Sequence, residues 1–311
     1  MKVGVVGVGA VGSACTMALL LRASAREIVL VDKVPARAAG VATDMRYGAA
    51  LVPGVDVRDG EYSDLAGAAV IMITAGINEK AGGATDRSDP SGRLKLLDVN
   101  AGVYRDVVPR LVAVAPDAML LVVTDPPDPL ADLTRRLAGH NRVLSTGTFL
   151  DSLRFRAELA RRLGVRPGSV EADVVGEHGT SEVFLWSSAR VGGVPVLEAL
   201  MGGATAVDDL RAAVERDVRY ANITIIEGTG ASQHGIGMVS TRITEMVLRN
   251  EQTVIPIGSY HATYGVTLSL PSAVGREGVS RVFEPPMSDE DRQALQRCVD
   301  TLKQAGARVA G

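Results

Sequence analysis

The sequence predicts an α/β protein: a doubly wound parallel sheet followed by a second α/β (α+β) region. Two observations lead to this fold class. Short apolar runs of strand length alternate with longer segments of helical periodicity through the first half of the chain. A glycine-rich turn also joins the first apolar run to the first helix. A length of 311 residues with 46% hydrophobic side chains allows about two domains with buried cores.

Composition excludes several classes of function. The formal net charge is −3 and no basic run exceeds two arginines, which argues against a nucleic-acid partner. Cys15 and Cys298 lie far apart with no Cys/His cluster nearby, so we expect free thiols, a reducing cytoplasmic compartment and no metal. No apolar stretch reaches the roughly 20 residues that span a bilayer. Lys2 and the later "ASA" imitate a signal peptide, but glycines at 4, 7, 9 and 12 favour a strand and a turn.

The first unit has the pattern of a dinucleotide site. Its strand, helix and strand are expected at 2–7, 10–22 and 27–31. Gly7, Gly9 and Gly12 fill GxGxxG, and Asp32 follows 20 residues after Gly12. These glycines allow a tight turn, close approach of a pyrophosphate and close helix packing, and the helix N-terminus faces the phosphates. Asp32 would bind a ribose diol and repel a 2′-phosphate, so the sequence favours NAD, although Lys33 and Arg37 keep NADP open.

The alternation continues along the first half. We expect helices at 35–48 and 92–114, strands at 55–57, 69–74 and 118–124, and a polar loop at 77–91. "TAG" (74–76) and "TDPP" (124–127) end two strands, and the carboxyl ends of parallel strands collect ligands. They are candidate lining for the nicotinamide, with ordinary turn chemistry as the alternative. The bond between Asp125 and Pro126 is a candidate cis peptide.

The second half contains the candidate chemistry. A helix expected at 147–164 places Asp151 and Arg154 one turn apart on one face, where they could simply form an exposed salt bridge. His178 lies in "VGEHGTSEV", between a glutamate and a glycine. An imidazole that exchanges protons needs a carboxylate on its other nitrogen, and a guanidinium binds a substrate carboxylate through two hydrogen bonds. His178, Asp151 and Arg154 could supply these three parts.

The chain contains, in order, the motifs "GVGAVG", "TAG", "DVNAG", "GTFLDSLRFR", "GEHGTSEV" and "PSAVGREGVSRV". In this order and spacing they closely resemble the lactate/malate dehydrogenase superfamily over essentially the whole chain. The resemblance implies a Rossmann-type NAD-binding domain over 1–145, a catalytic domain over 146–311 and a homodimer or homotetramer. It implies hydride transfer between nicotinamide and C2 of an L-2-hydroxy or 2-oxo acid. His178 would be the general acid/base, Asp151 its partner and Arg154 the clamp on the substrate carboxylate. The expected cofactor contacts are Gly7, Gly9, Ala10, Val11, Gly12, Asp32, Thr74, Ala75, Gly76, Asn100 and Val123.

The family also has a second arginine on a mobile loop, and here two candidates remain. Arg87 lies in "DRSD", which resembles the malate enzymes' motif. Arg93 lies seven residues before Asn100 of "VNAG", the spacing the family keeps, and Pro90-Ser91 reads as a helix start with Ser91 as N-cap. We prefer Arg93. The glycines at 82–83 and the polar composition suit a lid over the substrate.

Three departures from the family concern the substrate. Asp125 stands where the family has an asparagine beside the histidine, and a carboxylate accepts but does not donate. Glu79 or Lys80 falls near the position that is glutamine in lactate enzymes and arginine in malate enzymes, and Ser232 stands opposite in place of threonine. We therefore expect a substrate other than plain lactate or malate, either bulkier, as in the 2-hydroxyisocaproate dehydrogenase branch, or with a cationic tail. Reduction of a 2-imino acid, or an idle NAD-binding sensor, are the alternatives.

The remaining segments complete the expected fold. We predict helices at 216–230, 233–249 and 288–306 and strands at 252–260 and 264–275. Ser288 and Asp291 approximate a capping box. His234 is expected in a pocket wall or an interface rather than in the chemistry.

Overall fold

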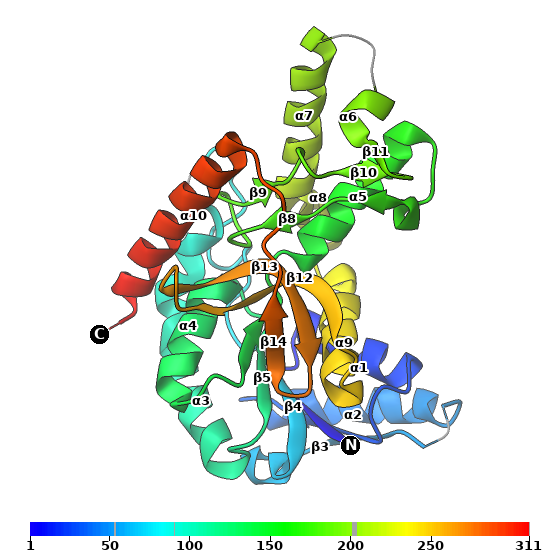
Figure 1. The fold of residues 1–311 in the computed structure, drawn as a ribbon. Coiled ribbons are helices and arrows are strands. Elements are labelled where there is room, and N and C mark those ends of the chain that lie inside the picture. The colour runs from blue at the N-terminus through cyan, green and yellow to red at the C-terminus, as the bar shows by residue number, and fades with distance from the viewer. Residues whose placement is uncertain (53, 90, 201–203, 311) are drawn as a thin grey trace.

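A nine-stranded sheet is the centre of the molecule (Figure 1). The structure is a computed structural model and describes residues 1–52, 54–89, 91–200 and 204–310. The strand order is β14-β13-β12-β6-β5-β4-β1-β2-β3. The strands are β1 (Lys2–Val6), β2 (Glu27–Val31), β3 (Asp56–Asp59), β4 (Ala68–Ile73), β5 (Met119–Val122), β6 (Val143–Ser145), β12 (Thr253–His261), β13 (Val266–Gly275) and β14 (Gly278–Val282).

The first six strands are parallel, and the predicted doubly wound fold is confirmed. β1 lies between β2 and β4, with Lys2 in register with Glu27 and Val6 in register with Ile73. The strand order therefore reverses between β1 and β4, and ligands of such sheets bind beyond the strand ends at this reversal. β12 then joins antiparallel to β6 through Gly258 and Ser145. The second half of the chain thus extends the sheet of the first half.

Two apolar cores lie on the two faces of this sheet. One contains residues of α1 (Ala10–Leu21), α2 (Pro35–Ala49) and α9 (His234–Arg249) packed on alternate strand residues. The other contains residues of α3 (Leu97–Val114) and α4 (Pro127–Ala138), with the end of α10 (Asp289–Arg308). α1 also packs directly against α9, which brings the second half of the chain over the nucleotide-binding unit (Figure 1).

The second region is smaller and less regular (Figure 1). Its core, around Phe155 and Trp186, is separate from the two that cover the large sheet. Its helices are α5 (Phe149–Leu163), α6 (Val196–Ala199), α7 (Ala204–Arg219) and α8 (Ala221–Thr229). Its short strands are β7 (Val170–Glu171), β8 (Val174–Val175), β9 (Val183–Phe184), β10 (Arg190–Val191) and β11 (Val194–Pro195). Single 3₁₀ turns are η1 (Tyr62–Leu65), η2 (Gly92–Leu96) and η3 (Pro167–Ser169).

Most predicted elements are present, and two need correction. The helix predicted over 216–230 is two helices, because the backbone leaves the helical region at Tyr220 (φ −104°, ψ 12°) between α7 and α8. The helix predicted over 92–114 begins as η2 and becomes α-helical at Leu97. Ser91 precedes η2 but its side chain makes no capping hydrogen bond, and Pro90 lies outside the described residues. Elements that were not predicted include α4, α6, most of α7, β14 and the short strands β7 to β11.

Two local predictions, the cis peptide bond and the capping box, are confirmed. The Asp125–Pro126 peptide bond is cis. Ser288 Oγ accepts the Asp291 N–H at 3.1 Å, and the Asp291 carboxylate accepts the Ser288 N–H at 2.9 Å, which completes the capping box. The two cysteines are free and buried. In the described part of the chain, no helix combines the length and the apolarity needed to cross a membrane.

Candidate active site

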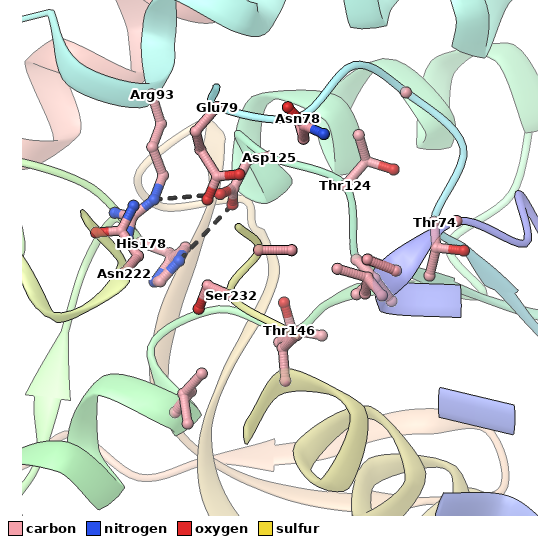
Figure 2. Close-up of a pocket in the computed structure, with 18 of the residues that line it drawn as sticks. Thr74, Asn78, Glu79, Arg93, Thr124, Asp125, Thr146, His178, Asn222 and Ser232 are labelled. Carbon is pink, nitrogen blue, oxygen red and sulfur yellow. Dashed lines mark ion pairs between the residues drawn. The ribbon is translucent and has the colours of Figure 1, made fainter. Parts of the chain in front are cut away.

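One cavity lies where the sheet reverses, between the first and second regions (Figure 2). It is lined by six of the predicted cofactor residues, namely Gly9, Ala10, Val11, Thr74, Gly76 and Val123. It is also lined by four of the five predicted catalytic residues, His178, Arg154, Arg93 and Asp125. The fifth, Asp151, lies behind His178 and is 1% exposed. The fold therefore brings the two predicted sets of residues to one place.

The glycine-rich turn has the shape that the motif requires. Gly7 has φ +95°, and a Cβ there would lie 2.5 Å from the Ala75 nitrogen. A Cβ on Gly12 would lie 2.1 Å from the Gly7 carbonyl oxygen, so the first helix packs too closely on the turn for any side chain. The space above Gly9 is open. The turn thus leaves room for a pyrophosphate at the N-terminus of α1, and the residues present fit a dinucleotide.

Asp32 is oriented by the backbone around it. Its Oδ2 accepts the Val8 N–H at 2.7 Å and its Oδ1 accepts the Val34 N–H at 2.9 Å. Arg37 Nη1 lies 3.5 Å from Oδ1. The carboxylate at the end of β2 would accept ribose hydroxyls and disfavour a 2′-phosphate, and Arg37 is already occupied with it. This geometry accords with NAD rather than NADP.

Two predicted cofactor residues support the cavity wall from behind. Asn100 Nδ2 donates to the Asp125 carbonyl at 2.7 Å, and its Oδ1 accepts the Ile77 N–H at 2.8 Å. The Ala75 carbonyl accepts the Thr124 hydroxyl at 2.9 Å. Neither Asn100 nor Ala75 lines the cavity itself. Their bonds hold the ends of β4 and β5 together at the point where the loop begins.

His178, Asp151 and Arg154 form one connected unit. His178 Nδ1 is hydrogen-bonded to Asp151 Oδ2, and Arg154 Nη1 donates to Asp151 Oδ1 at 3.0 Å. Asp151 and Arg154 are one turn apart on α5, as the helical spacing predicts. The salt bridge is not on the surface: the Arg154 side chain is 14% exposed and faces the cavity. The buried carboxylate therefore orients both the imidazole and the guanidinium.

The charges explain the proton affinity of this unit. Burial alone would lower the pKa of His178, but Asp151 outweighs it, and the net pKa of His178 lies above its ordinary value. Burial would likewise raise the pKa of Asp151, but the His178 ring and Arg154 hold it well below the ordinary value. The pair is thus poised as an imidazolium beside a carboxylate, which suits a group that donates a proton near neutral pH.

Arg93 and Arg87 are separated clearly by the structure. Arg93 is 8% exposed, and its Nε lies 3.2 Å from Asp125 Oδ2 within the cavity (Figure 2). Arg87 lies on the surface, where its guanidinium donates to both carboxylate oxygens of Glu227 on α8 at 2.6 and 2.8 Å. Arg87 also bonds to the Thr224 hydroxyl at 3.2 Å. Arg93 is therefore the arginine of the two that lies in the cavity with the predicted catalytic residues.

Glu79, Ser232 and Asn222 line the same cavity as His178 and Arg93 (Figure 2). Lys80 is exposed and is not among the lining residues. Burial, followed by the neighbouring Asp125, raises the pKa of Glu79 above its ordinary value. Asn222 is a lining residue that the sequence interpretation did not identify. His234 begins α9, is exposed and does not line the cavity.

Two further buried acids were missed. Asp128 on α4 accepts the backbone N–H of His178, and burial raises its pKa to about 7. Glu182 lies four residues after His178 with its Oε1 3.6 Å from Arg219 Nε, and burial raises its pKa well above the ordinary value. Glu182 lies in the motif "GEHGTSEV", and Asp128 directly follows the motif "TDPP". Their position beside predicted site residues is the sequence feature that could have identified them.

Comparisons with known proteins agree with this site. A model of the lactate/malate dehydrogenase NAD-binding domain matches residues 1–145, and a model of the alpha/beta C-terminal domain of the same family matches residues 148–310. The chain belongs to the lactate/malate dehydrogenase family, and its cofactor is NAD.

Individual relatives are similar over the full length. The L-lactate dehydrogenase of Thermus aquaticus is 44% identical over 318 residues, covering 99% of each chain. That of Chloroherpeton thalassium is 40% identical over 313 residues, covering both chains completely. The crystal structure of the minor L-lactate dehydrogenase of Enterococcus mundtii is 33% identical, has a TM-score of 0.89, and covers 99% of this chain and 98% of that one.

These relatives overturn one expectation. The prediction of a substrate other than plain lactate or malate is wrong, because relatives 40 to 44% identical over the whole chain are named L-lactate dehydrogenase. The 2-imino acid reductase and the idle sensor fail with it. The physical reason lies in the two acidic residues on which the prediction rested. Burial shifts Glu79 toward its neutral form, and Asp125 is paired with Arg93 and does not stand as a free charge.

Proposed function

We propose that the protein is an NAD-dependent L-lactate dehydrogenase that interconverts lactate and pyruvate. The observation that carries the proposal is the unit His178, Asp151 and Arg154, which opens into the same cavity as the glycine-rich turn. The bound nicotinamide supplies a hydride acceptor or donor for C2 of the substrate. The names of the full-length relatives support the choice of lactate.

Each side chain then has a distinct task. Arg154 binds the substrate carboxylate through paired hydrogen bonds, and its own position is set by Asp151. His178 Nε2 donates a proton to the carbonyl oxygen of pyruvate, or removes it from the hydroxyl of lactate, while Asp151 holds Nδ1. Arg93 lies beside this oxygen position and stabilises negative charge that develops there. The loop 77–91 closes the cavity against water, with Arg87 bound to α8.

A small monocarboxylate suits the charges of this cavity. Arg93, Arg154 and the imidazolium of His178 face the carboxylates of Asp125 and Asp151, while Glu79 has a raised pKa. The single carboxylate of a bound substrate adds a third negative charge, which balances the three cations. A second carboxylate on the substrate would meet Glu79 without a cation opposite it, which disfavours malate and oxaloacetate.

The proposal extends to the domains, the oligomeric state and the location of the protein. We propose an NAD-binding domain over 1–145 and a catalytic domain over 146–311. Exposed apolar side chains on packed helices, Met17 and Leu21 on α1 and Met238 on α9, support a homodimer or homotetramer, which light scattering after size exclusion would test. The free buried thiols support a cytoplasmic location.

The test is NADH oxidation against a panel of 2-oxo acids: pyruvate, oxaloacetate, and branched, aromatic and cationic members. We expect the highest kcat/KM with pyruvate. A clear preference for any other member, or no turnover of pyruvate by protein that binds NADH, would overturn the proposal.

A further inference from the structure

Asp125 stands between two cationic groups of the site. Its Oδ1 lies 3.7 Å from His178 Nε2, and its Oδ2 lies 3.2 Å from Arg93 Nε (Figure 2). The side chain is only 20% exposed. The contact with Arg93 is an ion pair without hydrogen-bond alignment, since Arg93 Nε has no hydrogen-bond partner among the residues that the structure describes. A carboxylate therefore occupies the side of the imidazole that faces the cavity.

His178 thus has carboxylates on both ring nitrogens, Asp151 at Nδ1 and Asp125 at Nε2. The charged and titratable groups around it come from every neighbouring element: Asp151 and Arg154 from α5, Asp128 from α4, Arg93 from η2, Glu79 from the loop, and Glu177 and Glu182 from its own segment. Asp128 binds the backbone of His178 and not the ring. Among the described residues, only the two aspartates form ion pairs with the ring.

We propose that Asp125 is a second counter-ion for the His178 imidazolium, held at Nε2 by Arg93, that keeps the proton on the ring of the free enzyme until substrate arrives. The inference rests on the proposed function, in which this proton goes to the carbonyl oxygen of pyruvate. Asp125 acts through His178 and is a positioning residue.

The electrostatics favour this role. An opposite charge within about 4 to 6 Å stabilises the charged form of a titratable group, and the effect is strong where water is largely excluded. Asp125 adds to Asp151 in raising the pKa of His178, while burial and Arg93 act in the opposite direction. An asparagine in the same place could donate a hydrogen bond but would carry no charge. Asp125 therefore favours the protonated ring, which is the form that reduces pyruvate, over the neutral ring that oxidises lactate.

The first test measures the ring directly and needs no turnover. The chain has four histidines, so the His178 signal in a titration by nuclear magnetic resonance is identified by its loss in His178→Asn. We expect its midpoint to lie at lower pH in Asp125→Asn than in the wild-type free enzyme. Glu79→Gln is the matched control, since it replaces another acidic side chain of the cavity that forms no ion pair with the ring among the described residues. An unchanged midpoint in Asp125→Asn, or equal shifts in both variants, would overturn the proposal.

The second test uses the pH dependence of kcat/KM in both directions. In Asp125→Asn the fall in kcat/KM for pyruvate on the alkaline side should begin at lower pH. At a fixed pH on that limb, kcat/KM divided by the acid plateau of the same variant should be about tenfold lower than in the wild type. The acid limb of lactate oxidation should move the same way, because that direction needs the neutral ring. Structural damage would lower both profiles without moving their limbs, and limbs that stay in place would contradict the proposal. If the wild-type protein does not reduce pyruvate, the proposed function fails, while the titration of the ring still decides the role of Asp125.

Discussion

The carboxylate of Asp128 holds the backbone of His178 in place. Its Oδ2 accepts the His178 N–H at 2.8 Å, and its Oδ1 accepts the hydroxyl of Ser145. Asp128 is fully buried at the start of α4, whereas His178 lies in a loop between two short strands. The position of the imidazole therefore depends on a residue that never faces the cavity.

This contact predicts a pH dependence of stability. Burial raises the pKa of Asp128 from 3.8 to about 7, so the folded protein binds this proton more tightly than the unfolded chain. The free energy of unfolding should then fall as pH rises from about 4 to about 7. An amide at this position can still accept from His178 and donate to Ser145. We expect Asp128→Asn to reduce the loss of stability between about pH 5 and pH 8 by about 2 to 3 kcal/mol, measured by urea unfolding.

The control for this prediction is Asp44→Asn, which changes an exposed aspartate of α2. It should leave the pH dependence as in the wild type. If Asp128→Asn also leaves it unchanged, the ionisation of Asp128 does not contribute to the loss of stability.

Replacement of His178 should separate chemistry from cofactor binding. His178→Asn removes the proton donor but none of the residues of the glycine-rich turn. We expect turnover to fall by about 10² to 10⁴ while the affinity for NADH, followed by its fluorescence, stays nearly constant. His234→Asn is the matched control, because His234 is exposed and does not line the cavity, and it should keep full activity. Residual turnover close to the wild-type rate would remove His178 from the mechanism.

Arg154 should act mainly on the binding of the substrate carboxylate. Arg154→Lys keeps the positive charge but loses the paired donors of the guanidinium. We expect KM for pyruvate to rise about 10- to 100-fold, because a hydrogen bond to a charged group contributes about 1.5 to 3 kcal/mol. Arg161→Lys alters an exposed arginine of the same helix that pairs with Glu158, and its kinetics should match the wild type. An equal change in both variants would indicate an effect on helix α5 rather than on the substrate.

Glu79 should set the discrimination between substrates with one and two carboxylates. Glu79→Arg places a cation where the substrate side chain enters the cavity. We expect the ratio of kcat/KM for oxaloacetate to that for pyruvate to rise by about tenfold or more. Glu79→Gln separates loss of the acid from gain of the cation and should change the ratio less. A ratio that does not move in Glu79→Arg would place the side chain of the substrate elsewhere.

Local signals in the sequence account for much of this protein. The glycine spacing predicts the turn because only glycine allows the φ of Gly7 and the contact of Gly12 with the Gly7 carbonyl. The spacing of Asp151 and Arg154 predicts their pairing because three residues make nearly one helical turn. The strand and helix periods identify the parallel sheet, and the order of the motifs identifies the family.

Only the tertiary structure decides which charges meet. Arg87 lies in the polar loop and Arg93 lies six positions later in η2. The spacing to Asn100 favours Arg93, but the burial of Arg93 beside Asp125 and the pairing of Arg87 with Glu227 depend on tertiary contacts. As isolated charges, Asp125 and Glu79 predict an unusual substrate. In the folded protein, burial raises the pKa of Glu79, and Asp125 pairs with Arg93. Both effects depend on contacts between segments that are distant in the sequence. Local conformation follows from neighbouring residues, whereas proton affinity follows from the surroundings that the fold assembles.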